Sequence, residues 1–333
     1  MSDHQVPFHV PDIGAEEMSA VMKVLESGWL TTGPKVQQFE ESFAAQVGAE
    51  HAVATNSCTA ALHVALEALG IEEGDEVLIP TMTFAATAEV VAYFKATPVL
   101  LDCDPFTLNL DVAALSGKIT RRTKAVIPVH IAGLPCDMQG ILAAASSHGL
   151  AVVEDAAHAF PSSYRGQPIG SVGDITCFSF YATKTLTTGE GGMATTNNQA
   201  WAERMRRMTL HGITKDAWKR YSDSGSWYYE IGAPGYKYNL TDIAAAIGIE
   251  QLRKCQRLLE ARRRIAAAYE CGFADLPELR LPSAGAEAEH SWHLYVIQLE
   301  LNRLRITRND FIQALKKYGV GASVHFIPLH LHP

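Results

Sequence analysis

Short apolar runs alternate with helical patterns between residues 50 and 200, and this alternation limits the possible folds more than any other feature of the chain. Several runs are apolar on both faces, which suits strands that helices cover on either side of a largely parallel sheet. A helix is expected over 59–69, where apolar residues recur at helical spacing before Gly70. The β-like runs are 52–55, 76–80, 98–102, 124–130, 150–153, 175–180 and 192–196. Their order predicts an α/β fold with a mostly parallel seven-stranded sheet between helices.

The pattern changes after Asn197 into a mixture of helix and strand signals. These signals predict a polar helix around Arg204, a long helix over 241–269, a strand over 292–297, a helix over 308–318 and a strand over 322–327. A chain of 333 residues that is 47% hydrophobic can bury a large core and divide into two domains. We expect a large domain over 15–250 and a smaller α+β domain over 251–333, with 1–14 packing near the small domain.

Charge and composition exclude several kinds of partner. The formal net charge of −8 argues against a nucleic-acid partner, because binding to a phosphate backbone relies on a basic surface. No run of about eighteen apolar residues occurs, so no membrane partner is expected. The start of the chain lacks the basic and apolar regions of a signal peptide. Six cysteines without a Cys-x-x-Cys pair are typical of reduced thiols and predict a cytoplasmic protein.

The long helix predicted over 241–269 carries a row of basic residues. They are Arg253, Lys254, Arg257, Arg262, Arg263 and Arg264. Such a row forms either a binding stripe or a solvated helix face, and the solvated face is favoured.

A hydroxyl-rich turn precedes the helix predicted over 59–69. Ser57, Cys58 and Thr59 follow the first β-like run, and free N–H groups at a helix N-terminus bind phosphate readily. Plain N-capping by Ser57 or Thr59 explains the same residues. The turn alone leaves a phosphate site and a simple helix cap as alternatives.

Three polar residues farther along the chain suggest chemistry at the end of the sheet. Asp155 closes a strand at the carboxyl edge, where it would either keep a pyridine nitrogen protonated or cap a turn. His158 would either hydrogen-bond a ring oxygen or fill a core position. Lys184 alone would be a surface lysine, but it follows a β-like run among small and hydroxyl residues. Together, Lys184 and the upstream Asp155 predict pyridoxal 5′-phosphate, bound covalently to Lys184.

Other patterns in the sequence favour no competing chemistry. Residues 189–192 (GEGG) lack the Gly-x-Gly-x-x-Gly spacing of a dinucleotide site. His325, His330 and His332 match no common zinc spacing, so no metal is expected. The chain has no Gly-x-Ser-x-Gly elbow of a serine hydrolase.

With these residues assembled, the chain resembles the sugar aminotransferases of the DegT/DnrJ/EryC1/StrS family, which have the PLP-dependent transferase fold type I. The resemblance covers nearly the whole chain. Its ordered motifs are 27–34 (SGWLTTGP), 56–63 (NSCTAALH), 74–77 (GDEV), 80–84 (PTMTF), 154–158 (EDAAH), 178–180 (FSF) with Lys184, 190–193 (EGGM), 235–239 (GYKYN) and 325–330 (HFIPLH).

The resemblance implies catalytic roles for Lys184, Asp155 and His158. Lys184 is then the covalent anchor of the cofactor, Asp155 pairs with its ring nitrogen, and His158 lies by its phenolic oxygen. Phe84 is implied to stack on the face of the ring.

The resemblance also implies how the phosphate and the substrate are bound. Asn239 is expected to reach the phosphate from a second subunit, so the protein is expected to be a homodimer with shared active sites. The phosphate ligands within one subunit are Ser57, Cys58, Thr59 and Ser179. Two histidines near the end, His325 and especially His330, are expected to approach the sugar.

The chain departs from the family pattern at three places. Cys58 stands where many relatives have glycine, although a backbone contact survives this change. Tyr181 stands where many relatives have histidine, which makes it a candidate substrate residue. Relatives continue for some tens of residues beyond Pro333, so the small domain is expected to be truncated.

The function implied is transfer of an amino group from glutamate to a nucleotide-linked keto sugar, for surface polysaccharide or glycan biosynthesis. Residues 212–218 and 235–239 resemble members that aminate C4 of UDP-sugars, which favours a UDP-4-keto sugar. The alternatives are a 3-aminotransferase and a dehydratase of the same family, although such dehydratases carry histidine at the position of Lys184. A non-catalytic regulatory relative is disfavoured because Lys184, Asp155 and Phe84 are retained.

Overall fold

A single sheet of seven strands forms the centre of the molecule. The computed structural model describes residues 5–214, 228–283, 285 and 287–333. In the sheet the strand order is β1-β9-β8-β5-β4-β2-β3, and only β9 runs antiparallel to its neighbours. The strands are β1 (His51–Thr55), β2 (Glu76–Pro80), β3 (Thr97–Leu101), β4 (Thr123–Val126), β5 (Ala151–Asp155), β8 (Ile175–Ser179) and β9 (Gly192–Thr196). The predicted mostly parallel α/β sheet is confirmed.

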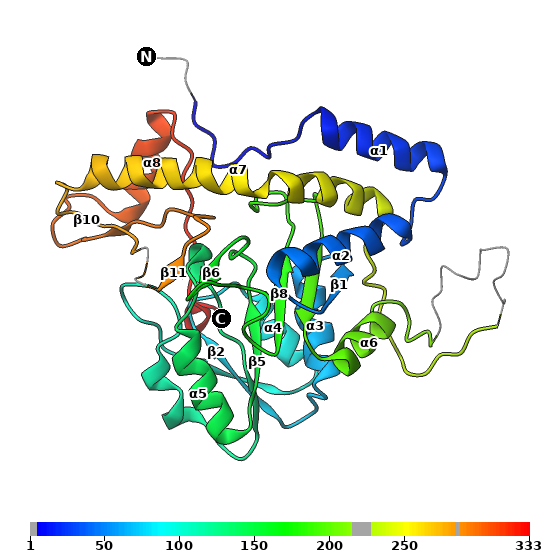
Figure 1. Cartoon of the computed structure of the whole chain (residues 1–333). Coiled ribbons are helices and arrows are strands. Elements are labelled where there is room, and N and C mark those ends of the chain that lie inside the picture. Colours follow the sequence, from blue (N-terminus) through cyan, green and yellow to red (C-terminus); the bar gives the residue numbers. More distant parts are fainter. Residues whose placement is uncertain (1–4, 215–227, 284, 286) are drawn as a thin grey trace.

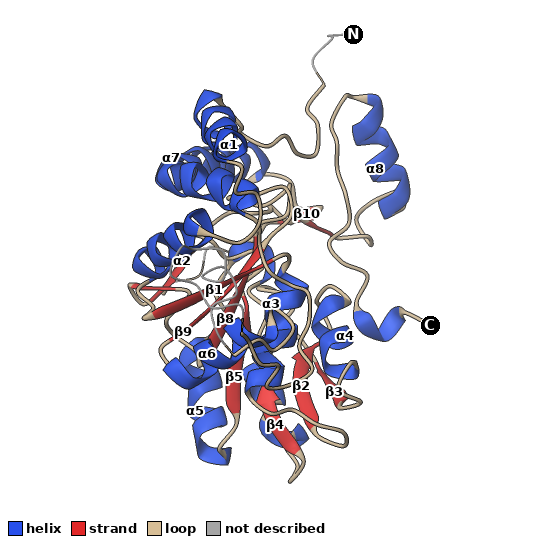
Figure 2. Ribbon diagram, turned by 90° about the vertical axis from the view of Figure 1, so that its right-hand side faces the viewer, coloured by secondary structure: helices blue, strands red, loops and turns tan. Residues whose placement is uncertain are grey.

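Helices cover both faces of this sheet, because alternate strand residues point to opposite sides. Ala52 and Ala54 of β1 pack with α2, whereas Val53 packs with α3 on the other face. The two views place α2 and α3 on opposite sides of the strands (Figures 1 and 2). One face is covered by α2 (Pro34–Val47), α5 (Met138–His148) and α7 (Asp242–Phe273); the other by α3 (Cys58–Ala68), α4 (Ala86–Ala92) and α6 (Gln199–Met208).

A cluster of phenylalanine rings joins α2 to the sheet. Phe43 of α2 is completely buried, and its ring centroid lies 4.9 Å from those of Phe160 and Phe178 and 5.3 Å from that of Phe180. Edge-on ring pairs of this kind add to the free energy of burial. The cluster therefore fixes β8, the strand that leads into the Lys184 loop.

The long helix α7 connects the sheet to the remaining C-terminal part. Figure 1 shows α7 lying across one end of the molecule and reaching towards α8 (Arg308–Lys317). Because α7 starts at Asp242 and continues to Phe273, the predicted boundary after residue 250 falls inside one helix. Val6 pairs with Val320, so the N-terminal segment contacts the chain after α8. The division at 250 stays a prediction.

The smaller elements include α1 (Ala15–Ser27), which packs on α7. Short strands form two additional sheets: β6 (Ser163–Tyr164), β7 (Gln167–Pro168) and β11 (Ala288–Glu289) in one, and β10 (Leu279–Arg280) and β12 (Gln298–Leu299) in the other. Short 3-10 turns lie at Val112–Ala114, Ser116–Lys118, Ile131–Gly133 and Leu329–Leu331. No helix in the described part of the chain has the length and apolar character needed to cross a bilayer.

Two strand predictions in the C-terminal part were wrong. Residues 292–297 and 322–327 form no strand; pairing near them is limited to β12, which begins at Gln298, and to the bridge of Val320 with Val6. The alternating apolar residues of 292–297 pack instead against the 3-10 turn at Ile131–Gly133, where Leu294 donates its N–H to Ala132 O at 3.2 Å. Tertiary packing thus replaced the local strand preference.

The predicted strand 124–130 is also shorter than expected. β4 ends at Val126, and the chain then turns at Pro128 towards Ile131–Gly133. Pro128 has no N–H to continue the ladder, although its carbonyl accepts the N–H of Asp155 at 2.9 Å. Ile127 and His130 still donate to the carbonyls of Leu78 and Asp155, and from Ile131 the chain turns away at the carboxyl edge of the sheet.

The basic row on α7 is only partly a solvated face. Lys254 is 15% exposed, and its Nζ lies 2.7 Å from Oε1 of the buried Glu17. Burial raises the pKa of Glu17, but hydrogen bonds from Lys254, Gly14 and Gln251 outweigh it and lower that pKa to about 2. Arg262 is likewise partly buried. The expectation of a solvated face is therefore wrong for these two residues.

Replacing Phe43 with alanine should destabilise the protein strongly. The loss of a fully buried ring, with the cavity left behind, should lower the free energy of unfolding by about 3–5 kcal/mol. Denaturant unfolding of the cofactor-free protein measures this value. As a control, Phe106→Ala removes a ring that is 63% exposed and should change stability by less than about 1 kcal/mol. Equal effects of the two substitutions would contradict the packing described for the ring cluster.

Candidate active site at the carboxyl edge of the sheet

Asp155 ends the central strand β5 and is buried. Its Oδ2 accepts a hydrogen bond from Thr87 Oγ1 of α4 at 2.8 Å, and its Oδ1 accepts the N–H of Ala157 at 3.2 Å. Burial raises the pKa of Asp155, whereas these two hydrogen bonds and the charge of Lys184 oppose that rise. Hydrogen bonds to the charged form are what a buried carboxylate needs to remain ionised.

His158 lies one turn farther along the chain, with a defined tautomer. Its Nδ1 accepts the N–H of Ala132 at 3.2 Å, so Nε2 carries the ring proton. Burial, together with the nearby charges of Lys184 and His325, holds the pKa of His158 well below its ordinary value. The ring is packed between Phe326, at a centroid distance of 5.7 Å, and His293, at 4.6 Å. His158 is thus a neutral, oriented N–H donor.

Lys184 lies in the loop between β8 and β9, where its N–H bonds to Tyr181 O at 2.9 Å. Its side chain is partly buried, and its Nζ has no hydrogen bond or ion pair with any residue that the structure describes. Burial lowers the pKa of the Lys184 amine, and the nearby acidic groups Cys58 and Asp155 only partly oppose this. More of the amine is therefore neutral at a given pH than in a solvated lysine.

The turn before α3 adopts the geometry of a helix cap. Ser57 Oγ accepts the N–H of Ala60 at 3.1 Å, so the capping alternative is confirmed for this side chain. The N–H groups of Cys58 and Thr59 lie in the first turn, where helix geometry provides no internal acceptor. These two N–H groups and the positive end of the helix can still hold an anion, and that role stays a prediction.

Gly192 brings β9 against this turn. A Cβ atom at Gly192 would lie 2.4 Å from Ser57 O and 2.6 Å from Cys58 N, so only glycine permits the contact. The Sγ of Cys58 donates towards Cys177 O at 3.6 Å, and burial raises the pKa of this thiol well above its usual value. Cys58 is therefore a neutral thiol facing the sheet.

Three further predicted residues lie near these groups but are less enclosed. Phe84 is 60% exposed, and its ring lies 5.7 Å from Phe326. Ser179 ends β8, and its Oγ accepts the N–H of Tyr181 at 3.4 Å. Tyr181 is 47% exposed. The exposed faces of Phe84 and Tyr181 leave both rings able to contact a bound molecule.

The C-terminal segment crosses the carboxyl end of β2. His330 Nδ1 lies 2.6 Å from Thr81 Oγ1, and Leu329 donates its N–H to Thr81 O at 2.8 Å. His325 stacks on Phe8 at 5.5 Å, and its pKa is lowered by burial and by Lys184. The segment thus carries both predicted substrate histidines to the edge of the sheet that holds Asp155.

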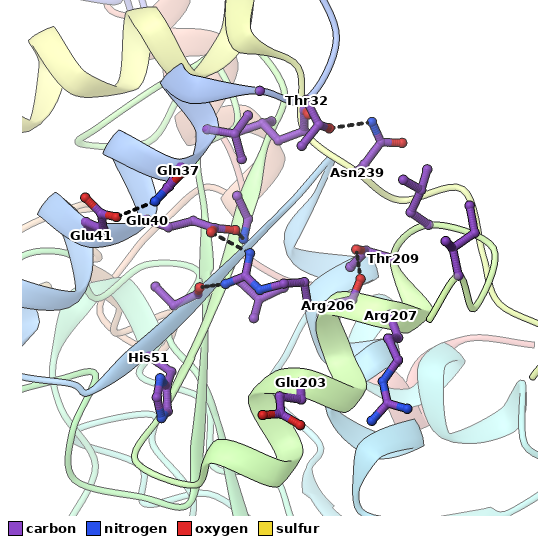
Figure 3. Close-up of a pocket in the computed structure, with 18 of the residues that line it drawn as sticks. Thr32, Gln37, Glu40, Glu41, His51, Glu203, Arg206, Arg207, Thr209 and Asn239 are labelled. Carbon is purple, nitrogen blue, oxygen red and sulfur yellow. Dashed lines mark hydrogen bonds and ion pairs between the residues drawn. The ribbon is translucent and has the colours of Figure 1, made fainter. Parts of the chain in front are cut away.

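Asn239 lines a different cavity with its side chain, although its backbone pairs with Thr55, two residues before Ser57. Its Nδ2 donates to Thr32 Oγ1 at 2.8 Å, and Lys237 Nζ donates to its Oδ1 at 2.6 Å. The cavity, of about 910 Å³, lies between α2, β1 and α6, where Arg206 bonds to Glu40 (Figure 3). None of the other predicted site residues lines it. A role of Asn239 at the site of a second subunit stays a prediction.

Sequence reasoning missed several residues that position this site. Thr87 lies one helical turn beyond Phe84 in the stretch 83–87 (TFAAT), a spacing that could have identified it. Ala132 could not have been identified, because its role rests on its backbone N–H and a φ of 58°. His293 and Phe326 belong to stretches that were predicted as strands.

The chain is similar over nearly its full length to known proteins. The spore coat polysaccharide biosynthesis protein SpsC of Bacillus subtilis is 52% identical over 332 residues, which cover 99% of this chain and 85% of SpsC. The uncharacterized protein MJ1066 of Methanocaldococcus jannaschii is 51% identical over 327 residues, covering 98% of this chain and 84% of that protein.

Solved structures of aminotransferases have the same fold. Spr1654 of Streptococcus pneumoniae, described as a sugar aminotransferase, superposes in its PLP form with a TM-score of 0.90 and 36% identity, covering 99% of this chain and 86% of that one. Its PMP form has also been solved. DesI, solved in the presence of its TDP-sugar product, gives a TM-score of 0.89 and 32% identity, covering 100% of this chain and 82% of DesI.

The residues present fit pyridoxal 5′-phosphate. Lys184 offers an amine with no partner in the described part of the chain, and Asp155 is a buried carboxylate that suits a protonated ring nitrogen. The close contact of Gly192 with the start of α3 forms a narrow cradle beside two free N–H groups, which suits a phosphate.

The family model of the DegT/DnrJ/EryC1/StrS aminotransferases matches residues 11–333. The extent of this match, the identity to SpsC and the shared fold agree with the motifs found in the sequence. Members of this family depend on pyridoxal phosphate. The chain belongs to the DegT/DnrJ/EryC1/StrS family of sugar aminotransferases.

Proposed function

We propose that this protein transfers an amino group from glutamate to a nucleotide-linked keto sugar, and that Lys184 is the residue at which the chemistry occurs. The observation that carries the proposal is the partly buried, partnerless amine of Lys184 beside Asp155 and His158. The TDP-sugar product of DesI and the name of SpsC support a nucleotide sugar used in polysaccharide biosynthesis. A UDP-4-keto sugar rests on the motif 235–239 and on 212–218, whose last residues lie outside the described part of the chain.

Lys184 would bond to the aldehyde carbon of the cofactor and later act on the amino donor. When bound, the cofactor supplies an electron sink for negative charge on the α-carbon of the donor. Lys184, freed by the incoming amine, would take the proton from the α-carbon as a base and deliver it as an acid to the carbon that Lys184 had itself been bonded to. Its lowered pKa favours this exchange, because more of the amine is neutral at a given pH than in a solvated lysine.

Asp155 and His158 would hold the two ends of the cofactor ring. Asp155 would keep the ring nitrogen protonated, and the hydrogen bonds from Thr87 and Ala157 favour its ionised form. His158 would donate its Nε2 proton to the phenolic oxygen, since Nδ1 already accepts the N–H of Ala132. Phe84 would cover one face of the ring.

The phosphate would be bound at the start of α3 by Ser57, Cys58 and Thr59, together with Ser179. We further propose that Asn239 contributes from a second subunit, which makes the active protein a homodimer. Tyr181, His325 and His330 would contact the sugar nucleotide. We also propose a cytoplasmic location, where nucleotide sugars and glutamate are available.

Replacing Lys184 with alanine should abolish the visible absorption band of the lysine-bound cofactor. Loss of proton transfer alone should slow conversion by glutamate by about 10²–10⁴-fold. Both effects are measured by mixing purified protein with pyridoxal phosphate, recording the spectrum, and following bleaching after glutamate is added. Lys118→Ala, which removes an exposed lysine of a 3-10 turn, should leave both signals unchanged. An unchanged band and bleaching rate in Lys184→Ala would refute the assignment.

A panel of 4-keto and 3-keto sugar nucleotides, tested for glutamate-dependent product, then identifies which carbon of the sugar ring receives the amino group.

Replacing Thr87 with valine should weaken cofactor binding by about 10-fold, the value of a hydrogen bond to a charged group. The Thr87 hydroxyl lowers the pKa of Asp155, so its removal raises that pKa further. Affinity should therefore be lost at a higher pH than in the wild type as the solution is acidified. Dissociation constants measured by absorbance from pH 5 to 9 test this. Thr196→Val, which removes a similar hydroxyl bond at the far end of β9, serves as the control; a matching pH shift there would contradict the role of Thr87.

A further inference from the structure

Three buried polar atoms without a hydrogen-bond partner, in His9, Thr185 and His293, belong to the surroundings of the Lys184 loop. Among the described residues, four such side-chain atoms occur: His9 Nε2, Thr185 Oγ1, His293 Nδ1 and Tyr295 Oη. Thr185 follows Lys184 directly, His9 interacts with the backbone of Ala182, and His293 packs on His158. Buried polar groups are normally satisfied in native proteins, so a local group of exceptions indicates a missing partner.

Arg262 of α7 lies among these atoms without an acidic partner. Its Nη1 donates to the backbone carbonyls of Trp292 and His293, both at 3.1 Å. No described acidic residue forms an ion pair with it, and burial lowers the pKa of its guanidinium. Its neighbours on the same helix, Arg257 and Arg263, do pair with carboxylates. A partly buried, unpaired cation is unfavourable unless a bound anion compensates it.

Basic side chains surround His293 although the protein as a whole is acidic. Burial, and then the basic groups His158, Lys184, Arg262 and His325, hold the pKa of His293 well below its usual value. The formal net charge of the chain is −8, so this gathering of basic side chains is a local arrangement. His293 is only 8% exposed, which limits the ligand to a small group.

We propose that Arg262 and His293 form the subsite for the α-carboxylate of the amino donor, with His9 and Thr185 beside it. This inference rests on the proposed transamination at Lys184. A carboxylate matches the forked donors of an arginine and would give His293 Nδ1 the partner that it lacks.

Reaction geometry favours this carboxylate over the diphosphate of a nucleotide sugar. The α-carboxylate is one bond from the carbon whose proton Lys184 moves, so its binding site must lie directly beside Lys184. The diphosphate is separated from the reacting ring carbon by several bonds and needs a larger, more open site. The enclosed position of His293 and Thr185 fits the smaller group.

The test measures binding and the two half-reactions separately in Arg262→Gln and His293→Phe. The probe is 2-methylglutamate, which has no proton on its α-carbon and cannot be converted; its dissociation constant is measured by calorimetry on the cofactor-loaded protein. We expect it to rise about 10–100-fold in Arg262→Gln and about 3–10-fold in His293→Phe. The half-reaction of the keto sugar with the amino form of the enzyme should stay within about 2-fold of the wild type.

Two measurements separate this role from a structural one. His293→Phe keeps the ring packing and removes the unpaired nitrogen, so the melting temperature of the cofactor-free protein should not fall. Arg262→Lys keeps the positive charge but loses the paired N–H donors of the guanidinium. It should therefore raise the dissociation constant of 2-methylglutamate less than Arg262→Gln does. The exposed Arg264→Gln on the same helix is the matched control and should bind the probe like the wild type.

Several outcomes would overturn the inference. One is an unchanged dissociation constant in both variants; another is a selective loss in the keto-sugar half-reaction, which would assign the subsite to the nucleotide. A lower melting temperature of cofactor-free His293→Phe, together with a raised dissociation constant for the probe, would show that the role of His293 is structural. If wild-type protein is not bleached by glutamate at all, the proposed function fails; if it is bleached and the variants bind normally, only this inference fails.

Discussion

The buried carboxylate of Asp155 at the end of the central strand is the constraint on which the rest of the site depends. A carboxylate in this position stays ionised only if donors reach it, and two do so, from Thr87 and from the backbone of Ala157. Neighbouring parallel strands end at the same edge, so the chain segments after β2 and β4 bring Thr87 and Ala132 to one place. The loop after β8 brings Lys184 there for the same reason.

A second consequence of this arrangement is that the basic side chains around the cofactor site have lowered pKa values. Burial lowers the pKa values of Lys184, His158 and His293; nearby basic groups lower those of the two histidines further, whereas Asp155 partly opposes the shift of Lys184. The result is a pair of neutral imidazoles and a lysine that loses its proton more readily than a solvated one, in a region where Arg262 has no acidic partner among the described residues. Such a region suits anionic ligands in a protein whose net charge would otherwise repel them.

Sequence reasoning worked best where local pattern and tertiary structure agree. All seven strands of the sheet were predicted because each is a short apolar run between turn signals, and buried strands of a parallel sheet have that composition. Asp155, His158 and Lys184 were identified by their places after such strands and by motif. The family resemblance then identified the cofactor that these three residues are expected to bind.

Sequence reasoning failed where a residue acts through its surroundings. The alternation in 292–297 is typical of a strand, yet these residues pack on a turn and carry His293 to the site. Arg262 looked like one of several solvated charges, because a helix sequence does not reveal which face another segment will cover. Thr87 and Ala132 act through one hydroxyl and one N–H, for which composition provides no signal.

The sequence by itself determined the α/β architecture, the family and the cofactor, because hydrophobic periodicity and ordered motifs are local and additive properties of the chain. Only the tertiary structure decided the tautomer of His158, the support of Asp155 and the position of Arg262, which has no acidic partner among the described residues, beside the partnerless nitrogen of His293. Those features depend on contacts between segments that are 26 to 68 residues apart in the chain, where burial changes the energies of charges and hydrogen bonds.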